Sequence, residues 1–231
     1  MAIQKNLEYY KRLFHETKVI DETYPVGGSI VWLPYGVKIR ENIEKFVCNL
    51  LEARNYRKYI FPNLVNFKAL EKINKDIKNF ERKVFWLNNK KYCLKPTGEP
   101  VIYQMFARWI KHEGDLPLKV FQIGNLFRPR KGSESLYYAN ESNFFTELHC
   151  ADKNYEACQE SFREGIEISK LVLDFLKIPY IMVIRPPWGN NPVSEKTIAF
   201  DAVLPVQRLS LIHISEPTRP LYISYAVFCL K

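Results

Sequence analysis

Two long strand patterns joined by a polar segment constrain the fold of this chain more than any other feature. Residues 118–127 and 142–150 each show an extended pattern, and residues 129–141 between them are polar and lack helical periodicity. A parallel crossover usually carries a helix, so a strand that returns without one is expected to pair antiparallel to the first. The chain is therefore predicted to contain an antiparallel sheet built around this pair.

The other strand patterns also occur in runs rather than alternating strictly with helices. Strands are expected at 29–34, 58–62, 83–87, 91–94, 180–184 and 196–204, and helices at 3–17, 37–54, 64–81, 99–111 and 154–176. Such an order predicts an α+β domain, an antiparallel sheet flanked by helices, rather than a doubly wound parallel sheet. We see no repeat or linker, so residues 1–208 are expected to belong to one domain.

Composition narrows the class of protein. The chain has 231 residues and five cysteines, none in a Cys-x-x-Cys pair, which argues against a zinc site or a disulfide framework. It has no apolar stretch long enough to span a membrane and no secretory leader at its start, so a cytoplasmic location is expected. The net charge of +9 is compatible with a polyanionic partner such as RNA or ATP.

The end of the chain differs in character from the rest. Residues 209–219 and 223–230 match a translated sequencing-library adapter in a closed reading frame. The rival interpretation is a strand-rich tail with a proline turn. We expect 209–231 to be adapter-derived and to lie outside the fold, and we expect the domain in 1–208 to be incomplete.

Three short segments carry side chains suited to chemistry. Arg128 follows the strand 118–127, where a rigid strand end could hold its guanidinium against a phosphate. In Lys95-Pro96-Thr97-Gly98-Glu99, the Thr97 hydroxyl and the Glu99 carboxylate could converge on a small ligand with an ammonium group. The alternatives are a solvated arginine and an ordinary helix start, in which Thr97 caps and Glu99 favours the dipole.

The third segment is the returning strand. Because side chains alternate along a strand, Phe145, Glu147 and His149 are expected on one face. An aromatic ring, a carboxylate and an imidazole facing the same way could form the wall of a binding pocket. A sheet face with mutually paired polar groups is the alternative.

Together these segments resemble prolyl-tRNA synthetase of the archaeal and eukaryotic type, a family of class II aminoacyl-tRNA synthetases. The resemblance covers about residues 19–206 and follows the family's order of segments. The matching pieces are Tyr24-Pro25-Val26-x-Gly28, Val31-Trp32-x-Pro34-Tyr35-Gly36, Lys95 to Glu99 (similar to Arg-Pro-Thr-Ser-Glu), Asp115 to Lys119 with Asn125-x-Phe127-Arg128, Ile178-Pro179-Tyr180, Arg185 to Trp188 and Ser194 to Asp201.

The resemblance implies a class II antiparallel sheet and an enzyme that uses ATP and Mg²⁺ to activate proline for transfer to tRNA. It implies that Thr97, Glu99, Phe145, Glu147 and His149 form the proline pocket, and that Arg128 holds the α-phosphate and the carboxylate. It also implies a homodimer formed through residues 37–62, which correspond to the first class-defining motif.

The sequence departs from the family at the expected ATP contacts. Arg130 stands where the family has a glutamate, and Asn140 and Glu141 stand near the place of an Arg-Glu pair. The third class motif is absent from the chain, so residues 1–231 alone are expected to be inactive. Two hypotheses remain open: a working, divergent synthetase, or a diverged paralogue that binds or activates an amino acid without charging tRNA.

Overall fold

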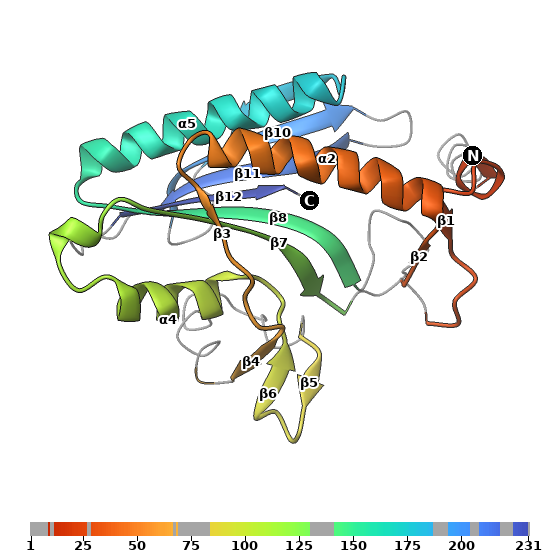
Figure 1. The fold of residues 1–231 in the computed structure, drawn as a ribbon, viewed down its shortest axis with the longest axis horizontal. Helices are drawn as coiled ribbons and strands as arrows, with labels where there is room; N and C mark the ends of the chain where they lie inside the picture. The colour runs from red at the N-terminus through yellow and green to blue at the C-terminus, as the bar shows by residue number, and fades with distance from the viewer. Residues whose placement is uncertain are drawn as a thin grey trace.

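The computed structural model describes residues 9, 12–26, 29–66, 68, 84–129, 141–186, 194–203, 208–217 and 224–230. Its centre is a seven-stranded sheet with helices on both faces (Figure 1). The strand order is β3-β7-β8-β12-β11-β10-β9, and every pairing is antiparallel except that of β3 with β7. The predicted α+β class and the antiparallel sheet are confirmed.

The strand pair that opened the sequence argument forms the core of this sheet. β7 spans Leu118–Phe127, as predicted, and β8 spans Glu141–Asp152, slightly longer than predicted. Their register places Phe121 opposite Leu148 and Gln122 opposite Glu147. The remaining strands are β3 (Arg57–Lys58), β9 (Tyr180–Ile184), β10 (Ser194–Val203), β11 (Arg208–Pro217) and β12 (Ser224–Leu230).

Each face of the sheet has its own apolar core. On one face lie α2 (Pro34–Glu52) and α5 (Tyr155–Phe175), which run side by side in Figure 1. Their core comprises Val47, Leu51, Tyr56, Phe121, Leu148, Cys150, Phe162, Ile168, Val172, Leu173, Ile198 and Phe200. On the other face lies α4 (Glu99–Trp109), whose core comprises Phe61, Ile102, Phe106, Val120 and Ala151. Adjacent β8 residues therefore belong to different cores, as strand alternation requires.

Several local expectations differ from the structure. Pro34 does not end a strand but begins α2, because proline is tolerated in the first helical turn, where its missing N–H is not needed. Residues 64–66, expected in a helix, form strand β4, because they pair with another strand of the chain. β4 joins β5 (Trp86–Leu87) and β6 (Tyr92–Leu94) in a small second sheet, while β1 (Ile20–Asp21) pairs with β2 (Val31–Trp32).

The backbone of the last segment also differs from expectation. Residues 208–217 and 224–230, expected to lie largely outside the fold, form β11 and β12 and fill the sheet between β8 and β10. Two facing strand edges with unpaired N–H and C=O groups favour pairing with any β-prone segment. The adapter origin of 209–231 stays a prediction, and resequencing the gene beyond the codon for Arg208 decides it.

One arginine fastens α2 to the start of β8. The Arg40 guanidinium donates to the Asn143 carbonyl oxygen at 2.8 Å and to its side-chain oxygen at 3.3 Å. It also lies 4.9 Å from the ring centroids of both Trp32 and Phe144, a cation–π arrangement. The Trp32 indole donates to the same Asn143 side chain at 3.0 Å.

No helix among the described residues is long and apolar enough to cross a membrane.

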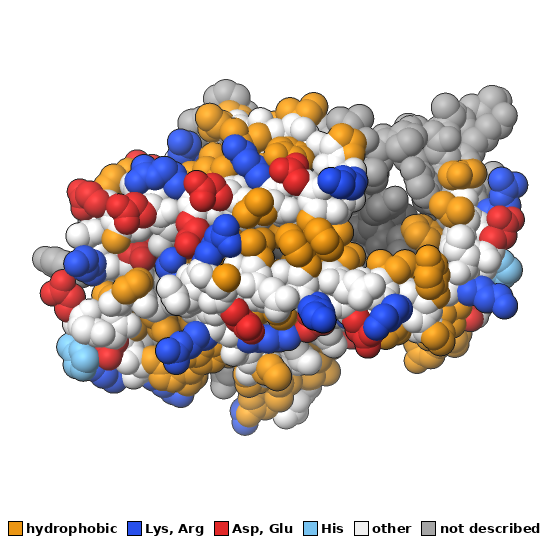
Figure 2. Space-filling view, turned by 45° about the horizontal axis from the view of Figure 1, so that its top comes forward, with side chains coloured by type: hydrophobic (Ala, Val, Ile, Leu, Met, Phe, Trp, Pro, Cys, Tyr) orange, Lys and Arg blue, Asp and Glu red, His pale blue; other side chains and the backbone are white. Residues whose placement is uncertain are grey.

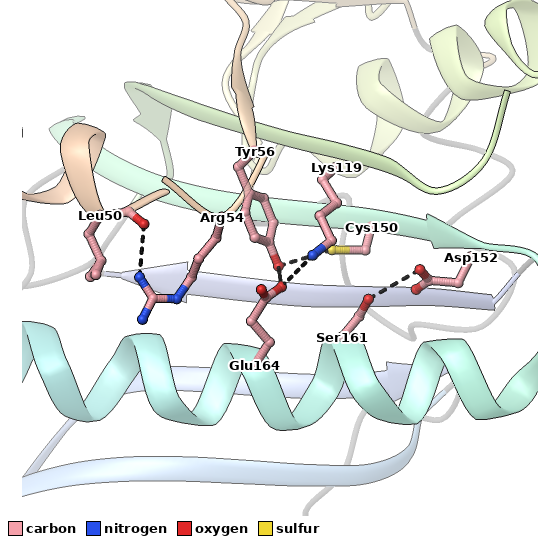
Figure 3. A network of polar contacts seen from close by, with 8 residues as sticks. All are labelled: Leu50, Arg54, Tyr56, Lys119, Cys150, Asp152, Ser161 and Glu164. Atoms are coloured by element: carbon pink, nitrogen blue, oxygen red, sulfur yellow. Dashed lines mark hydrogen bonds and ion pairs between the residues drawn. The ribbon is translucent and has the colours of Figure 1, made fainter. Parts of the chain in front are cut away.

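A polar network holds α5 against the sheet (Figure 3). Glu164 of α5 accepts a hydrogen bond from the Lys119 ammonium at 2.7 Å and one from the Tyr56 hydroxyl at 3.1 Å. Cys150 lies 3.2 Å from the same hydroxyl, and burial raises the pKa of its thiol to about 12. The thiol therefore stays neutral at physiological pH and serves as a buried packing group.

Asp152, which pairs with Ser161 beside this network, is incompletely paired. One carboxylate oxygen accepts from Ser161 at 3.1 Å, but the other has no hydrogen-bond partner among the described residues. Burial raises the pKa of Asp152 to about 6, against hydrogen bonding from Ser161, which lowers it. Because the folded pKa exceeds the unfolded one, the ionised side chain weakens the fold as pH rises from about 4 to above 6.

We predict that Asp152→Asn stabilises the protein at neutral pH, because the neutral amide can still accept from Ser161 and carries no buried charge. The gain should vanish as pH falls toward about 4, where the native carboxyl is protonated. Urea denaturation across this range measures it. The matched variant Asp174→Asn, on the exposed side of α5, removes no buried charge and should give no comparable gain at neutral pH. An Asp152→Asn gain that does not change with pH would contradict the assignment.

Candidate functional site

The site forms where the segment before α4 crosses the end of β7. The Lys95 carbonyl accepts from the Phe127 N–H at 2.8 Å, and the Lys95 N–H donates to the Asn63 carbonyl at 2.7 Å. Arg128, just past β7, donates from Nε to the Pro96 carbonyl at 2.7 Å. These bonds bring residues 95–99 and Arg128 together, although about thirty residues separate them in the sequence.

Thr97 and Glu99 converge as the sequence predicts. The Thr97 hydroxyl donates to the Glu99 carboxylate, and both side chains are partly exposed. Thr97 does not cap α4, since Gly98 occupies the N-cap position and no side chain caps the helix. The capping alternative for Thr97 is therefore wrong, whereas Glu99 does lie in the first helical turn, where a negative charge is favourable.

The β8 residues share one face, as predicted. Glu147 faces Gln122 of β7, and His149 packs edge-on against the Tyr103 ring of α4 at 5.5 Å. Leu148 between them points into the opposite core. Phe145 is 5% exposed, and Glu147 and His149 are fully buried.

Glu147 and His149 belong to a row of buried polar groups that also includes Gln122 and Lys95. The Lys95 ammonium donates to Gln122 Oε1 at 3.1 Å, and Gln122 Nε2 donates to Glu147 Oε1. The other oxygen of Glu147 lies 3.3 Å from His149 Nε2. His149 Nδ1 is buried and has no hydrogen-bond partner among the described residues.

The contacts within this row of buried polar groups favour the ionised form of the Glu147 carboxylate. Burial acts to raise the pKa of Glu147, but contacts with His149, Gln122 and the Lys95 charge outweigh it and hold the pKa below its usual value. Burial lowers the pKa of Lys95, and the nearby Glu147 charge opposes this shift. Opposite charges in a dry environment favour each other's ionised form.

Sequence reasoning assigned no role to Lys95 or Gln122. Gln122 did carry a signal, since it is a polar residue on the site face of β7, where Val120 is fully buried. Its partner on β8 becomes visible only once the register of the two strands is known.

Gly98 explains how the loop approaches β8 so closely. A Cβ added to Gly98 would lie 2.1 Å from Glu147 Oε1, 2.5 Å from Glu147 Cδ and 2.7 Å from Gln122 Nε2. Its φ of −80° is open to any residue, so glycine is required here by space and not by backbone conformation.

All six residues that the sequence analysis singled out therefore lie around the junction of β7, β8 and the start of α4. Arg130 and Asn140, the departures from the family, lie outside the described residues. Glu141 is described, and it accepts from the Asn125 side chain at 3.2 Å. The described residues contain no cluster of histidine, cysteine, aspartate and glutamate able to hold a metal ion.

An antiparallel sheet carries an arginine, a hydroxyl and carboxylates at one strand junction. A family model described as the tRNA synthetase class II core domain (G, H, P, S and T) matches residues 83–219, and the chain belongs to this family. The match extends past Arg208 into the segment of questioned origin.

The comparisons narrow the class further, to relatives named proline–tRNA ligase. That of Methanopyrus kandleri is 37% identical over 206 residues, 86% of this chain and 42% of the relative. That of Methanothermobacter thermautotrophicus is 35% identical with the same coverage. The chain thus spans less than half the length of these curated relatives.

Solved structures show the same fold. Giardia lamblia prolyl-tRNA synthetase in complex with prolyl-adenylate superposes with a TM-score of 0.91 at 21% identity, covering 99% of this chain and 50% of that one. The Cryptosporidium parvum enzyme, complexed with L-proline and AMP, gives 0.85 at 18% identity, covering 99% and 51%.

We predict that Gly98→Ala destabilises the chain by about 1–3 kcal/mol, because the new methyl group overlaps the Glu147 carboxylate. Urea denaturation measures the change. The control is Gly114→Ala, where the nearest atom to the added Cβ is His112 Nδ1 at 3.3 Å, and its cost should be smaller. Equal costs at the two glycines would show that Glu147 does not press against the loop.

Proposed function

We propose that this chain supplies the amino-acid-activating site of a proline–tRNA ligase, which forms prolyl-adenylate from proline and ATP and transfers proline to tRNA. The observation that carries the proposal is the convergence of Thr97, Glu99 and Arg128 above a buried wall of β8 side chains. Relatives named proline–tRNA ligase at 35–37% identity support the choice of amino acid.

Different polar groups of the site would bind different parts of the substrates. Glu99 and Thr97 present a carboxylate and a hydroxyl, which suit the secondary ammonium of proline. Arg128 is held by the Pro96 carbonyl through Nε. Its two terminal nitrogens have no hydrogen bond to a described residue, and we propose that they bind the substrate carboxylate and the α-phosphate. Phe145 and His149 would form the apolar side of the pocket. Apolar fit alone separates similar substrates by only about 1–3 kcal/mol, so the polar contacts carry much of the selectivity.

The reaction is a displacement at phosphorus. A carboxylate oxygen of the amino acid bonds to the α-phosphorus, the bond from that phosphorus to the bridging oxygen breaks, and pyrophosphate leaves with the electron pair. Charge accumulates on the α-phosphate oxygens, where a preorganised cation stabilises the transition state. Arg128 is the cation that we propose for this role, and Mg²⁺ would arrive with the ATP phosphates.

Transfer to tRNA is the second half of the proposal. The net charge of +9 suits a polyanionic partner and a cytoplasmic setting suits translation. Arg130, in place of the family's glutamate, keeps one rival open: a diverged paralogue that binds or activates an amino acid without charging tRNA.

The proposed activity is tested by proline-dependent ATP–pyrophosphate exchange with the product of the resequenced gene. We predict that Arg128→Ala lowers the exchange rate by about 10²–10³-fold, because a cation at the α-phosphate is lost. The control is Arg108→Ala on the exposed side of α4, which should leave exchange unchanged.

The possible results separate the hypotheses. Exchange together with prolyl-tRNA formation supports the ligase. Exchange without tRNA charging supports the paralogue, and no exchange with any amino acid rejects both enzymatic functions. Full activity of Arg128→Ala would remove Arg128 from the site.

We also propose that residues 37–62 form the interface of a homodimer. Apolar side chains gather on the face presented by α2 and α5, between charged ones (Figure 2). In the 37–62 range, Val37 and Ile39 are 39% and 38% exposed, and Ile60 is 92% exposed. Exposed apolar side chains within this range are compatible with an interaction surface.

We predict that the chain of 27.3 kDa runs as a dimer in light scattering and that Ile39→Asp combined with Ile60→Asp makes it a monomer, because charges would be buried unpaired. Ile181→Asp is the control, since Ile181 is 54% exposed on β9, outside this range. A monomeric wild type, or equal effects of both changes, would reject this interface.

A further inference from the structure

The site residues lie in two layers. The upper layer is partly exposed and comprises Thr97, Glu99 and Arg128. The lower layer comprises Lys95, Gln122, Glu147 and His149, which are at most 2% exposed. A ligand that enters from solvent therefore meets the upper layer first.

Both carboxylate oxygens of Glu147 are engaged by neighbouring side chains. Oε1 accepts from Gln122 Nε2, and Oε2 lies 3.3 Å from His149 Nε2. The side chain is fully buried. A buried carboxylate with both oxygens engaged can support its neighbours, but it offers little to a substrate ammonium.

Glu147 lies directly against the turn that carries the upper layer. The carboxylate is so close to Gly98 that even a methyl group there would overlap it. Gly98 separates Thr97 from Glu99, so any displacement of the Glu147 side chain removes the support beneath both. The position of the carboxylate thus sets the position of the turn.

Lys95 adds a positive charge near the buried carboxylate, beside the contacts that Glu147 makes with His149 and Gln122. Its ammonium and the Glu147 carboxylate bond to opposite ends of the Gln122 amide, the first at 3.1 Å. A carboxylate buried without a compensating charge would take up a proton instead. Lys95 also belongs to the turn itself, since its backbone is bonded to both Phe127 and Asn63.

We propose that Lys95, Gln122 and Glu147 are positioning residues, which hold the Thr97–Glu99 turn in place for the amino acid without contacting it. This proposal rests on the proposed function, because it assigns the amino-acid contacts of that site to the upper layer. It removes Glu147 from the direct ligands that the family resemblance implies.

The first test follows the Glu147 carboxyl carbon by NMR in the ¹³C-labelled 231-residue chain and needs no activity. Lys95→Met should raise the pH at which Glu147 titrates, and Lys95→Arg should restore it. The control, Lys119→Met, removes a partly buried lysine that pairs with Glu164 on the α5 face of β7, and should leave Glu147 unchanged. If Glu147 titrates at the same pH in Lys95→Met as in the native chain, the proposed role of Lys95 is overturned.

The second test adds L-proline to the same labelled chain. The Glu99 carboxyl resonance should shift on saturation by more than that of Glu147. A larger shift at Glu147 than at Glu99 would make Glu147 a direct ligand and overturn the proposal. If no resonance of the site responds to proline in the labelled product of the resequenced gene either, the proposed function fails, while the Lys95→Met titration still decides the role of Lys95.

The third test uses the exchange assay to distinguish a positioning role of Lys95 from a general loss of stability. Lys95→Met should raise the KM for proline about tenfold or more, with the KM for ATP changed by less than about twofold. The acid limb of the proline profile should move to higher pH, in step with the Glu147 titration. Equal losses for both substrates with an unmoved acid limb would indicate only a weakened fold and would overturn the proposal.

Discussion

The pairing of β7 with β8 is the constraint on which the rest of the structure depends. Its register sends Phe121 and Leu148 to the α5 face and Gln122 and Glu147 to the α4 face. A slip of β8 by one residue would turn its side chains over, placing Glu147 among the apolar side chains beneath α5. The cost of that change disfavours the slipped register and keeps Glu147 beside Gln122 on the α4 side.

Patterns within one element predicted the fold well. The ten residues of β7, the helix α5 and the shared face of Phe145, Glu147 and His149 all follow from local periodicity, which tertiary contacts reinforce. Elements whose form depends on a distant partner were harder. β4 became a strand because β6 lies beside it, and β11 and β12 because two open edges flank them.

The site residues show the same difference between features that depend on one element and features that depend on a distant partner. Thr97 and Glu99 are two residues apart, so their meeting could be predicted, and Arg128 could be predicted from its place at a strand end. The roles of Lys95 and Gln122 could not, because each role is defined by a side chain on another element. A buried lysine also reads from the sequence as a surface residue, since lysine is seldom buried without a partner.

The buried chain from Lys95 to Glu147 has a consequence for how this site can evolve. Replacing only one of these side chains leaves a charge or a polar group without a partner in a dry interior. That change costs more than replacing the whole set with apolar residues. Single substitutions along this path are therefore selected against even where a double or triple replacement would be harmless. Gly98 adds a further dependence, because a larger residue there is tolerated only after the Glu147 side chain has moved. Divergence at these four positions should proceed by coordinated replacement, with changes at one position conditional on the state of the others.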